Sequence, residues 1–217
     1  MSMAELALKV VLSYLLGSLL GSLILGRLCG GPDIRASGSG SAGATNALRS
    51  RGKIFALGVT VIDVGKGWIA THLLPVLLYP AERAPAAVHA WVPVACGAAA
   101  MVGHVYPLWF GFRGGKAVAT CFGALLGLVP RLAVAALLTW VAVLVCTGFV
   151  GLASMVATAM LPLAVSWADP GYHASLLAFG LFSAALIVFT HRGNVVRMWA
   201  GCEPRARRVW LFGRRAA

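Results

Sequence analysis

Long uninterrupted apolar runs constrain the fold of this chain more than any other feature of its sequence. Of its 217 residues, 60% are hydrophobic and only 11% are charged, whereas a soluble domain has about 25% charged residues. The apolar runs are continuous rather than alternating, which is typical of membrane helices and excludes a membrane β-barrel. We therefore expect an all-α, polytopic integral membrane protein.

The apolar runs predict seven transmembrane helices. A span needs roughly 20 apolar residues, and the fourth candidate is short and ends at Pro130, so we expect it to be tilted or only partly spanning. The first run is too long for a signal peptide, so we expect it to remain as a helix. We find no repeat and no linker, and therefore expect a single domain over residues 1–217. The candidate spans cover about residues 5–28, 54–79, 86–108, 117–129, 131–149, 150–168 and 172–190.

Lysine and arginine are distributed unequally between the two sides of this predicted bundle. One side carries most of them, including the C-terminal tail, whereas the other side carries Lys9, Arg83 and Arg131. Because basic loops stay in the cytoplasm, we expect the N-terminus outside and the C-terminus in the cytoplasm. The net charge of +12 then reflects topology and attraction to anionic lipids, and we expect no nucleic-acid partner.

The first polar loop, residues 34–53, has the sequence IRASGSGSAGATNALRSRGK and lies between two apolar runs. Small residues let a backbone approach a ligand closely and orient N–H groups toward an anion, and arginine binds phosphate through two donors. The alternative is a flexible loop that ends in a helix cap. The candidate ligand groups are the polar Ser39, Thr45 and Asn46, the turn-forming Gly40 and Gly43, and the cationic Arg49.

A second segment with similar chemistry is GFRGGK, residues 111–116. Gly114 and Gly115 precede a predicted helix start, where unpaired N–H groups and the helix dipole favour anions, and Lys116 adds a point charge. A Walker A loop is excluded because no Ser or Thr follows the lysine. The alternative is a basic turn that only sets topology.

The third segment is HRGN, residues 191–194. His191 and Asn194 are three residues apart and share a helix face, and histidine can donate to phosphate or move a proton. The alternative is an interfacial histidine at a helix end.

Charged residues also occur inside the second predicted span. Asp63 and Lys66 are three residues apart, and we interpret them as an ion pair that orients the helix. His104 precedes the glycine segment and is expected to support it. The sequence offers no carboxylate pair, no Ser–His–Asp order and no metal cluster, so we expect no carboxylate base beside the phosphate-binding segments.

Together these segments resemble the bacterial acyl-phosphate:glycerol-3-phosphate 1-acyltransferase family of integral membrane enzymes. The likeness covers nearly the whole chain in order, through GSLILGRLCGGPDIRASGSGSAGATNALRSRGK, IDVGKG, GHVYPLWFGFRGGKAVAT and HRGNVVR. It implies a seven-helix monomer in the bacterial inner membrane, with cytoplasmic loops forming the active site and with no metal or other cofactor. It also implies two substrates, acyl phosphate and glycerol 3-phosphate.

The resemblance also implies roles for individual residues. The expected catalytic residues are Ser39, His191 and Asn194. The expected substrate- and phosphate-binding residues are Gly40, Gly43, Thr45, Asn46, Arg49, Gly114, Gly115, Lys116 and Ser154.

This chain departs from the family pattern at a few positions in these segments. Ser41 stands where the family usually has Asn, and Gly193 stands where it often has an acidic residue. Ala117 stands where the family has glycine. If position 117 needs a positive φ, the methyl group is costly; if it is already helical, alanine is harmless.

The expected reaction is attack of the glycerol 3-phosphate 1-hydroxyl on the acyl carbonyl of acyl phosphate. The products are lysophosphatidic acid and phosphate, as in the first step of phospholipid synthesis. One alternative is a transporter of organic phosphates, which predicts inverted repeats and a polar path through the membrane. Another is a divergent, non-catalytic relative that binds acidic lipids.

Overall fold

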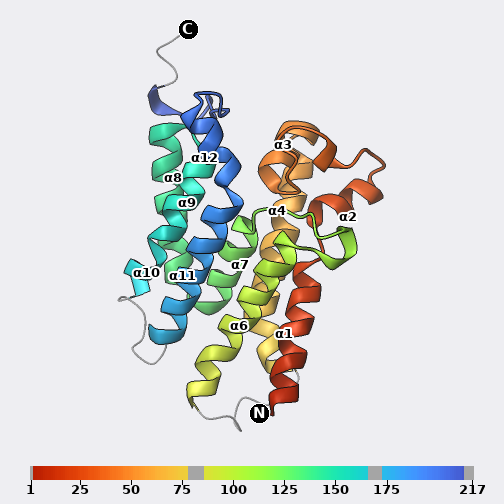
Figure 1. Cartoon of the computed structure of the whole chain (residues 1–217), viewed down its shortest axis with the longest axis vertical. Helices are drawn as coiled ribbons and strands as arrows, with labels where there is room; N and C mark the ends of the chain where they lie inside the picture. Colours follow the sequence, from red (N-terminus) through yellow and green to blue (C-terminus); the bar gives the residue numbers. More distant parts are fainter. Residues whose placement is uncertain (1, 78–85, 166–172, 213–217) are drawn as a thin grey trace. The chain divides into compact units, whose positions relative to one another are not determined.

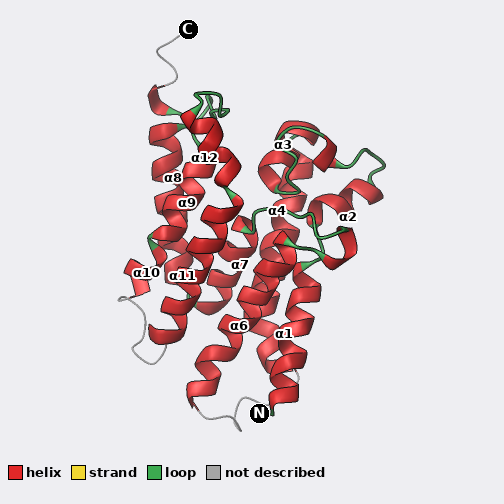
Figure 2. Ribbon diagram, in the orientation of Figure 1, coloured by secondary structure: helices red, strands yellow, loops and turns green. Residues whose placement is uncertain are grey.

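The computed structural model describes residues 2–77, 86–165 and 173–212. Within these ranges the secondary structure is helical and contains no strand (Figure 2), which confirms the predicted all-α class. The chain divides into two compact units, Met1–Val129 and Pro130–Ala217.

In the first unit α1 packs along α6, and α4 packs along α7 (Figure 1). Glycines make both contacts close: a Cβ on Gly17 of α1 would overlap the backbone of Ala100, and one on Gly67 of α4 would overlap the backbone of Thr120. Such small-residue contacts bring membrane helices into backbone contact. The elements are α1 (Met3–Gly17), α2 (Gly21–Leu28), η1 (Ile34–Ala36), α3 (Ala44–Arg51), α4 (Lys53–Trp68), η2 (Ile69–Leu73), α5 (Leu74–Leu77), α6 (Ala86–Val105), η4 (Leu108–Phe110) and α7 (Val118–Leu128).

In the second unit α9 packs against α8 and α11, and α12 continues from the end of α11 (Figure 1). Gly148, with a φ of +76°, forms the turn between α8 and α9, a conformation that glycine adopts without strain. The elements are α8 (Pro130–Thr147), α9 (Val150–Ala159), α10 (Leu161–Ala164), α11 (His173–Thr190) and α12 (Arg192–Trp199).

Each of the seven predicted spans contains helix. Within the described residues, four helical segments are long and apolar enough to cross a membrane: Lys53–Leu77, Ala90–Phe110, Pro130–Thr147 and His173–Thr190. A fifth is obtained if α1 and α2 are counted as one bent span. The remaining two apolar segments, Val118–Leu128 and Val150–Ala164, are shorter, and the first of these is the segment expected to be tilted or partly spanning.

The first predicted span, residues 5–28, is broken rather than continuous. α1 ends at Gly17, α2 begins at Gly21, and the two helices are bent by 50°. The break leaves backbone groups without helical partners, and such groups are costly in an apolar surrounding. Polar side chains from other helices supply two of the missing partners.

The partners at the break come from a buried cluster of Asp63, Lys66 and His104, each at most 3% exposed. Lys66 Nζ lies 2.9 Å from Asp63 Oδ1, which confirms the predicted ion pair. Lys66 also donates to the carbonyl of Leu19 at 2.9 Å, and Asp63 Oδ1 accepts from the N–H of Gly21 at 3.3 Å. The pair therefore joins α4 to both sides of the break between α1 and α2.

We expect Lys66→Met to destabilise the protein by about 3–5 kcal/mol, because it leaves the buried Asp63 carboxylate without its counter-ion. The measurement is the midpoint of thermal unfolding in detergent. Lys53→Met is the matched control, since Lys53 is exposed at the start of α4. Equal midpoints for the two variants would contradict this role.

Candidate functional site

The first polar loop folds around the side chain of Asn46, which is 2% exposed. Its amide nitrogen donates to the carbonyls of Ile34, Ser37 and Ser41 at 2.8, 3.1 and 3.0 Å. Its Oδ1 accepts from the N–H of Ser39 at 3.0 Å. The amide thus holds together a loop that has little regular structure of its own.

The other predicted residues of this loop either form its turns or lie exposed on its surface. Gly40 has a φ of +69°, so it takes a turn that favours glycine. Gly43 is the N-cap residue of α3. Ser39, Thr45 and Arg49 are exposed, which leaves their side chains accessible to a ligand.

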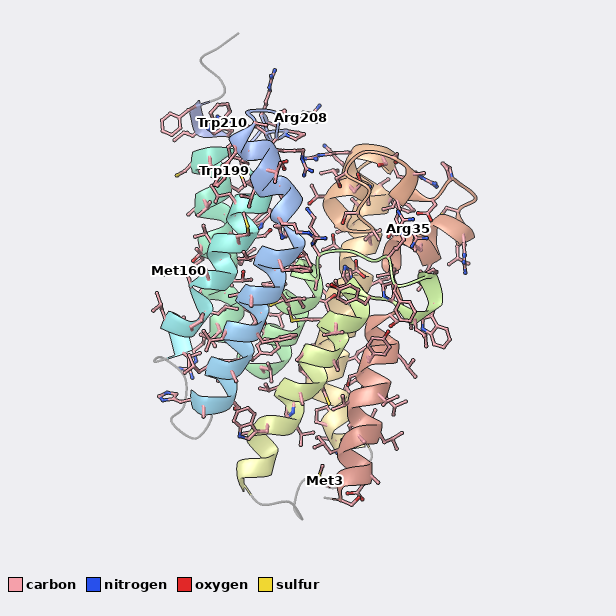
Figure 3. All side chains as sticks on the ribbon, in the orientation of Figure 1. Met3, Arg35, Met160, Trp199, Arg208 and Trp210 are labelled. Carbon is pink, nitrogen blue, oxygen red and sulfur yellow. The ribbon has the colours of Figure 1, made fainter. Side chains whose placement is uncertain are left out.

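Arg35 fastens this loop to the glycine segment (Figure 3). Its guanidinium donates to the backbone carbonyls of Phe110 and Arg113 at 2.9 and 2.7 Å. It also pairs with Asp33 at 2.7 Å, and this hydrogen bond lowers the pKa of the Asp33 carboxyl below its ordinary value. The two segments are also joined by a hydrogen bond from the Ala42 N–H to the Gly114 carbonyl, at 3.4 Å.

The glycine segment packs against the C-terminal end of α6. The N–H groups of Gly114 and Gly115 donate to the carbonyls of Val105 and His104 at 3.1 and 3.0 Å. A Cβ on Gly114 would overlap the His104 carbonyl, and one on Gly115 would overlap His104 Nε2. Glycine is therefore required here for close approach.

These bonds determine which N–H groups can meet an anion. The N–H groups of Gly114 and Gly115 are bonded to α6, so the unpaired N–H groups are those of the helix start that follows, where we expected them. The N–H groups that have no partner inside a helix are those of the first turn of α7, which begins at Val118, two residues after Lys116. An anion at this turn would meet that helix end and the lysine.

Ala117 adopts the left-handed conformation, with φ +59° and ψ +11°. This decides between the two alternatives left open by the sequence: the position where the family has glycine does require a positive φ. A residue other than glycine in this region stores about 1–3 kcal/mol of strain. Phe112, five residues earlier in the glycine segment, also has a positive φ of 57°.

The third predicted segment lies at the junction of α11 and α12 in the second unit. His191 is the N-cap residue of α12 and is 3% exposed. Its Nδ1 lies 2.8 Å from the carbonyl of Ile187; a carbonyl only accepts, so Nδ1 carries a proton. Asn194 is 7% exposed.

A buried carboxylate, which the sequence did not lead us to expect, lies beside Asn194. The amide of Asn194 donates to Glu203 Oε1 at 2.6 Å, and Arg197 Nε donates to Glu203 Oε2 at the same distance. The Glu203 side chain is only 3% exposed. A carboxylate therefore does lie beside the third segment, where its two oxygens accept hydrogen bonds from Asn194 and Arg197.

Ser154 lies on α9 with its hydroxyl engaged. It donates to the carbonyl of Val150 at 2.9 Å and accepts from Trp140 Nε1 at 3.1 Å. One turn earlier on the same helix, a Cβ on Gly151 would lie 3.0–3.1 Å from the Asn194 side chain. The N-terminal part of α9 therefore lies against the third segment.

The family model described as glycerol-3-phosphate acyltransferase matches residues 7–201. This chain is 44% identical to the glycerol-3-phosphate acyltransferase of Pseudomonas fluorescens over 90% of its own length and 97% of the relative. It is 40% identical to that of a Synechococcus species, over 91% and 94% of the two chains. The chain belongs to the glycerol-3-phosphate acyltransferase family.

Solved structures of integral membrane glycerol 3-phosphate acyltransferase PlsY have the same fold. The PlsY structure in its glycerol 3-phosphate form is 34% identical to this chain and superposes with a TM-score of 0.79. The match covers 92% of this chain and 94% of the PlsY chain. Its lysophosphatidic acid form is 33% identical, with a TM-score of 0.76 and the same coverage. These matches confirm the family that the sequence motifs indicated.

Sequence reasoning missed two supporting residues in this family member, Glu203 and Arg35. Glu203 is one of only six acidic residues in the chain, and that scarcity was the one available signal. Arg35 is one of four basic residues between positions 34 and 53, and nothing in the sequence distinguishes it as the one that binds the glycine segment.

Asn46→Ala should loosen the first loop, because it removes the four hydrogen bonds that its amide makes. We expect trypsin to cut at Arg49 and Arg51 at least about tenfold faster, since cleavage follows local opening. Thr45→Ala is the control, because its exposed neighbouring side chain makes no bond within the loop. Unchanged cleavage of the Asn46 variant would contradict the role.

Proposed function

We propose that this chain transfers an acyl group from acyl phosphate to the 1-hydroxyl of glycerol 3-phosphate. The products are lysophosphatidic acid and inorganic phosphate. Family membership supports the acyl transfer, and the observation that carries the proposal is the fastening of the first loop to the glycine segment by Arg35. That contact brings two phosphate-favouring segments of the first unit to one place.

Charge is the main contribution of this site to the reaction. Acyl phosphate is a mixed anhydride, and when its C–O bond breaks, negative charge grows on the departing phosphate. Lys116 and the first turn of α7 stabilise that charge, as donors fixed before reaction do. The proton of the attacking hydroxyl leaves with the phosphate, so no carboxylate base is needed.

The remaining residues bind and orient the substrates. Ser39 and Arg49 are exposed on the first loop and bind phosphate oxygens together with Thr45. Asn194 donates to glycerol 3-phosphate, and His191, whose Nδ1 proton is bonded to the Ile187 carbonyl, binds it through Nε2. Ser154 contributes its hydroxyl. Asn46 acts by shaping the loop, together with the turns at Gly40 and Gly43, because its amide makes four bonds within it.

We further propose one functional domain with seven membrane helices, acting as a monomer in the bacterial inner membrane. The bent pair α1–α2 counts as one span, and the two shorter apolar segments complete the seven. The basic loops then lie in the cytoplasm, where glycerol 3-phosphate is available to the site.

Purified protein mixed with acyl phosphate and glycerol 3-phosphate should release phosphate and form lysophosphatidic acid in equal amounts. Acyl coenzyme A in place of acyl phosphate should give no product. Arg49→Ala and Lys116→Ala should each lower kcat/KM about ten- to hundredfold, because each removes a charged hydrogen bond of roughly 1.5–3 kcal/mol.

Lys53→Ala is the matched control for this assay, since Lys53 is a basic, exposed residue at the end of the first loop that is not among the predicted site residues. Wild-type activity in both the Arg49 and the Lys116 variants would show that these residues do not bind the substrates, and would contradict the proposed site. Binding of both substrates without product would favour the transporter or the non-catalytic lipid-binding alternative.

A single cysteine placed at position 50 in a cysteine-free variant tests the orientation. It should react with a membrane-impermeant maleimide only after the cells are opened, because the basic first loop is expected in the cytoplasm. A cysteine at position 82 should react in intact cells. Labelling of position 50 from outside would overturn the orientation and the location of the site.

A further inference from the structure

We propose that His104 is a further substrate-binding residue, which donates a hydrogen bond from its Nε2–H to the phosphate group held at the glycine segment. The inference rests on the proposed function and adds a donor that the sequence pattern assigned only to support. It depends on three observations: how the ring is held, which nitrogen carries the proton, and where that nitrogen points.

Lys66 holds the ring from its Nδ1 side, at a distance of 2.8 Å from Nζ. An ammonium group has three N–H donors and no acceptor. Those of Lys66 meet Asp63 Oδ1 at 2.9 Å, the Leu19 carbonyl at 2.9 Å and His104 Nδ1. All three donors are therefore directed at acceptors, and Nδ1 is one of them.

The proton of a neutral His104 then lies on Nε2, because Nδ1 accepts from Lys66. The other possible arrangement would have Nδ1–H donate to Asp63. That distance is 3.6 Å, which is too long for a hydrogen bond. Asp63 and Lys66 thus fix the tautomer as well as the orientation of the ring.

The Nε2–H is directed at the glycine segment. A Cβ on Gly115 would overlap Nε2, so this edge of the ring faces the backbone at 115 and a side chain there would block it. Among the residues that the structure describes, Nε2 makes no hydrogen bond, although the residue is only 2% exposed. Nε2 is not one of the fully buried polar atoms that lack a partner, so an acceptor from outside the protein can reach it.

A phosphate oxygen is the acceptor that fits this position. Lys116 follows Gly115 directly, and the start of α7 follows Lys116, so the donor lies where an anion is already favoured. His104 stays neutral in this role and transfers no proton. The acyl transfer therefore has the same reactants and products as proposed above. Phosphate from either substrate has the same chemistry, and the kinetic test separates the two sources.

His104→Asn and His104→Gln form a matched pair for the test. The Asn oxygen replaces Nδ1 and accepts from Lys66, but the variant lacks a donor at the Nε2 position; the Gln amide reaches that position and donates. His104→Asn should raise one KM about ten- to hundredfold, whereas His104→Gln should stay within about threefold of the wild type. The corresponding changes at exposed His72 should leave both KM values unchanged.

A raised KM for acyl phosphate assigns the bound phosphate to the acyl donor, and a raised KM for glycerol 3-phosphate assigns it to the acceptor. Equal loss in the Asn and Gln variants, or no loss in either, would overturn the donor role. Thermal unfolding of both variants shows whether the fold is intact. If either variant does not fold, nitrogen-15 NMR of the wild-type protein tests the donor role instead.

Nitrogen-15 NMR of the wild-type protein with labelled histidine tests the tautomer without turnover. The His104 signals should show an unprotonated Nδ1 and a protonated Nε2, and the Nε2 signal should shift when inorganic phosphate is added. A proton on Nδ1, or no shift at saturating phosphate, would overturn the inference. If the wild type shows this shift but releases no phosphate from acyl phosphate, the proposed reaction fails and the donor role stands.

Discussion

The buried contacts of Asp63, Lys66 and His104 are the interaction on which the first unit depends. Charges in an apolar interior are tolerated only when they are paired and hydrogen-bonded. Here the pair also satisfies backbone groups of Leu19 and Gly21, and these groups exist because the first helix is broken. The break and the charges therefore stabilise each other, and removal of either leaves the other unsatisfied.

The same cluster contacts the residues that position both phosphate-favouring segments, the first loop and the glycine segment. α2 begins at Gly21, beside Asp63, and the next residue, Ser22, donates to the carbonyl of Ala42 in the first loop at 2.6 Å. On the other side, the His104 carbonyl accepts from the glycine segment. The buried residues thus position the site, while Ser39 and Arg49 remain exposed to bind a ligand.

Much of this could be predicted from the sequence, and the limits have physical causes. Apolar length located the helices, and the three-residue spacing of Asp63 and Lys66 predicted their ion pair, because both signals are local. The break at Gly17 and the bonds of the Gly114 N–H depend on contacts with distant helices. The binding of Asn194 to Glu203 likewise requires the C-terminal segment to fold back, which periodicity does not encode.

The left-handed Ala117 shows how strongly the surroundings determine the glycine segment. An isolated alanine would avoid this conformation, at a cost of about 1–3 kcal/mol. The two preceding glycines are bonded to the end of α6, and the carbonyl of Ala117 accepts from the N–H of Cys121 at 2.8 Å. With both sides of residue 117 held by these bonds, the chain enters α7 through a positive φ of 59° at Ala117. The strain is therefore imposed by the anchoring of the segment to His104, the residue to which we assign the additional phosphate contact.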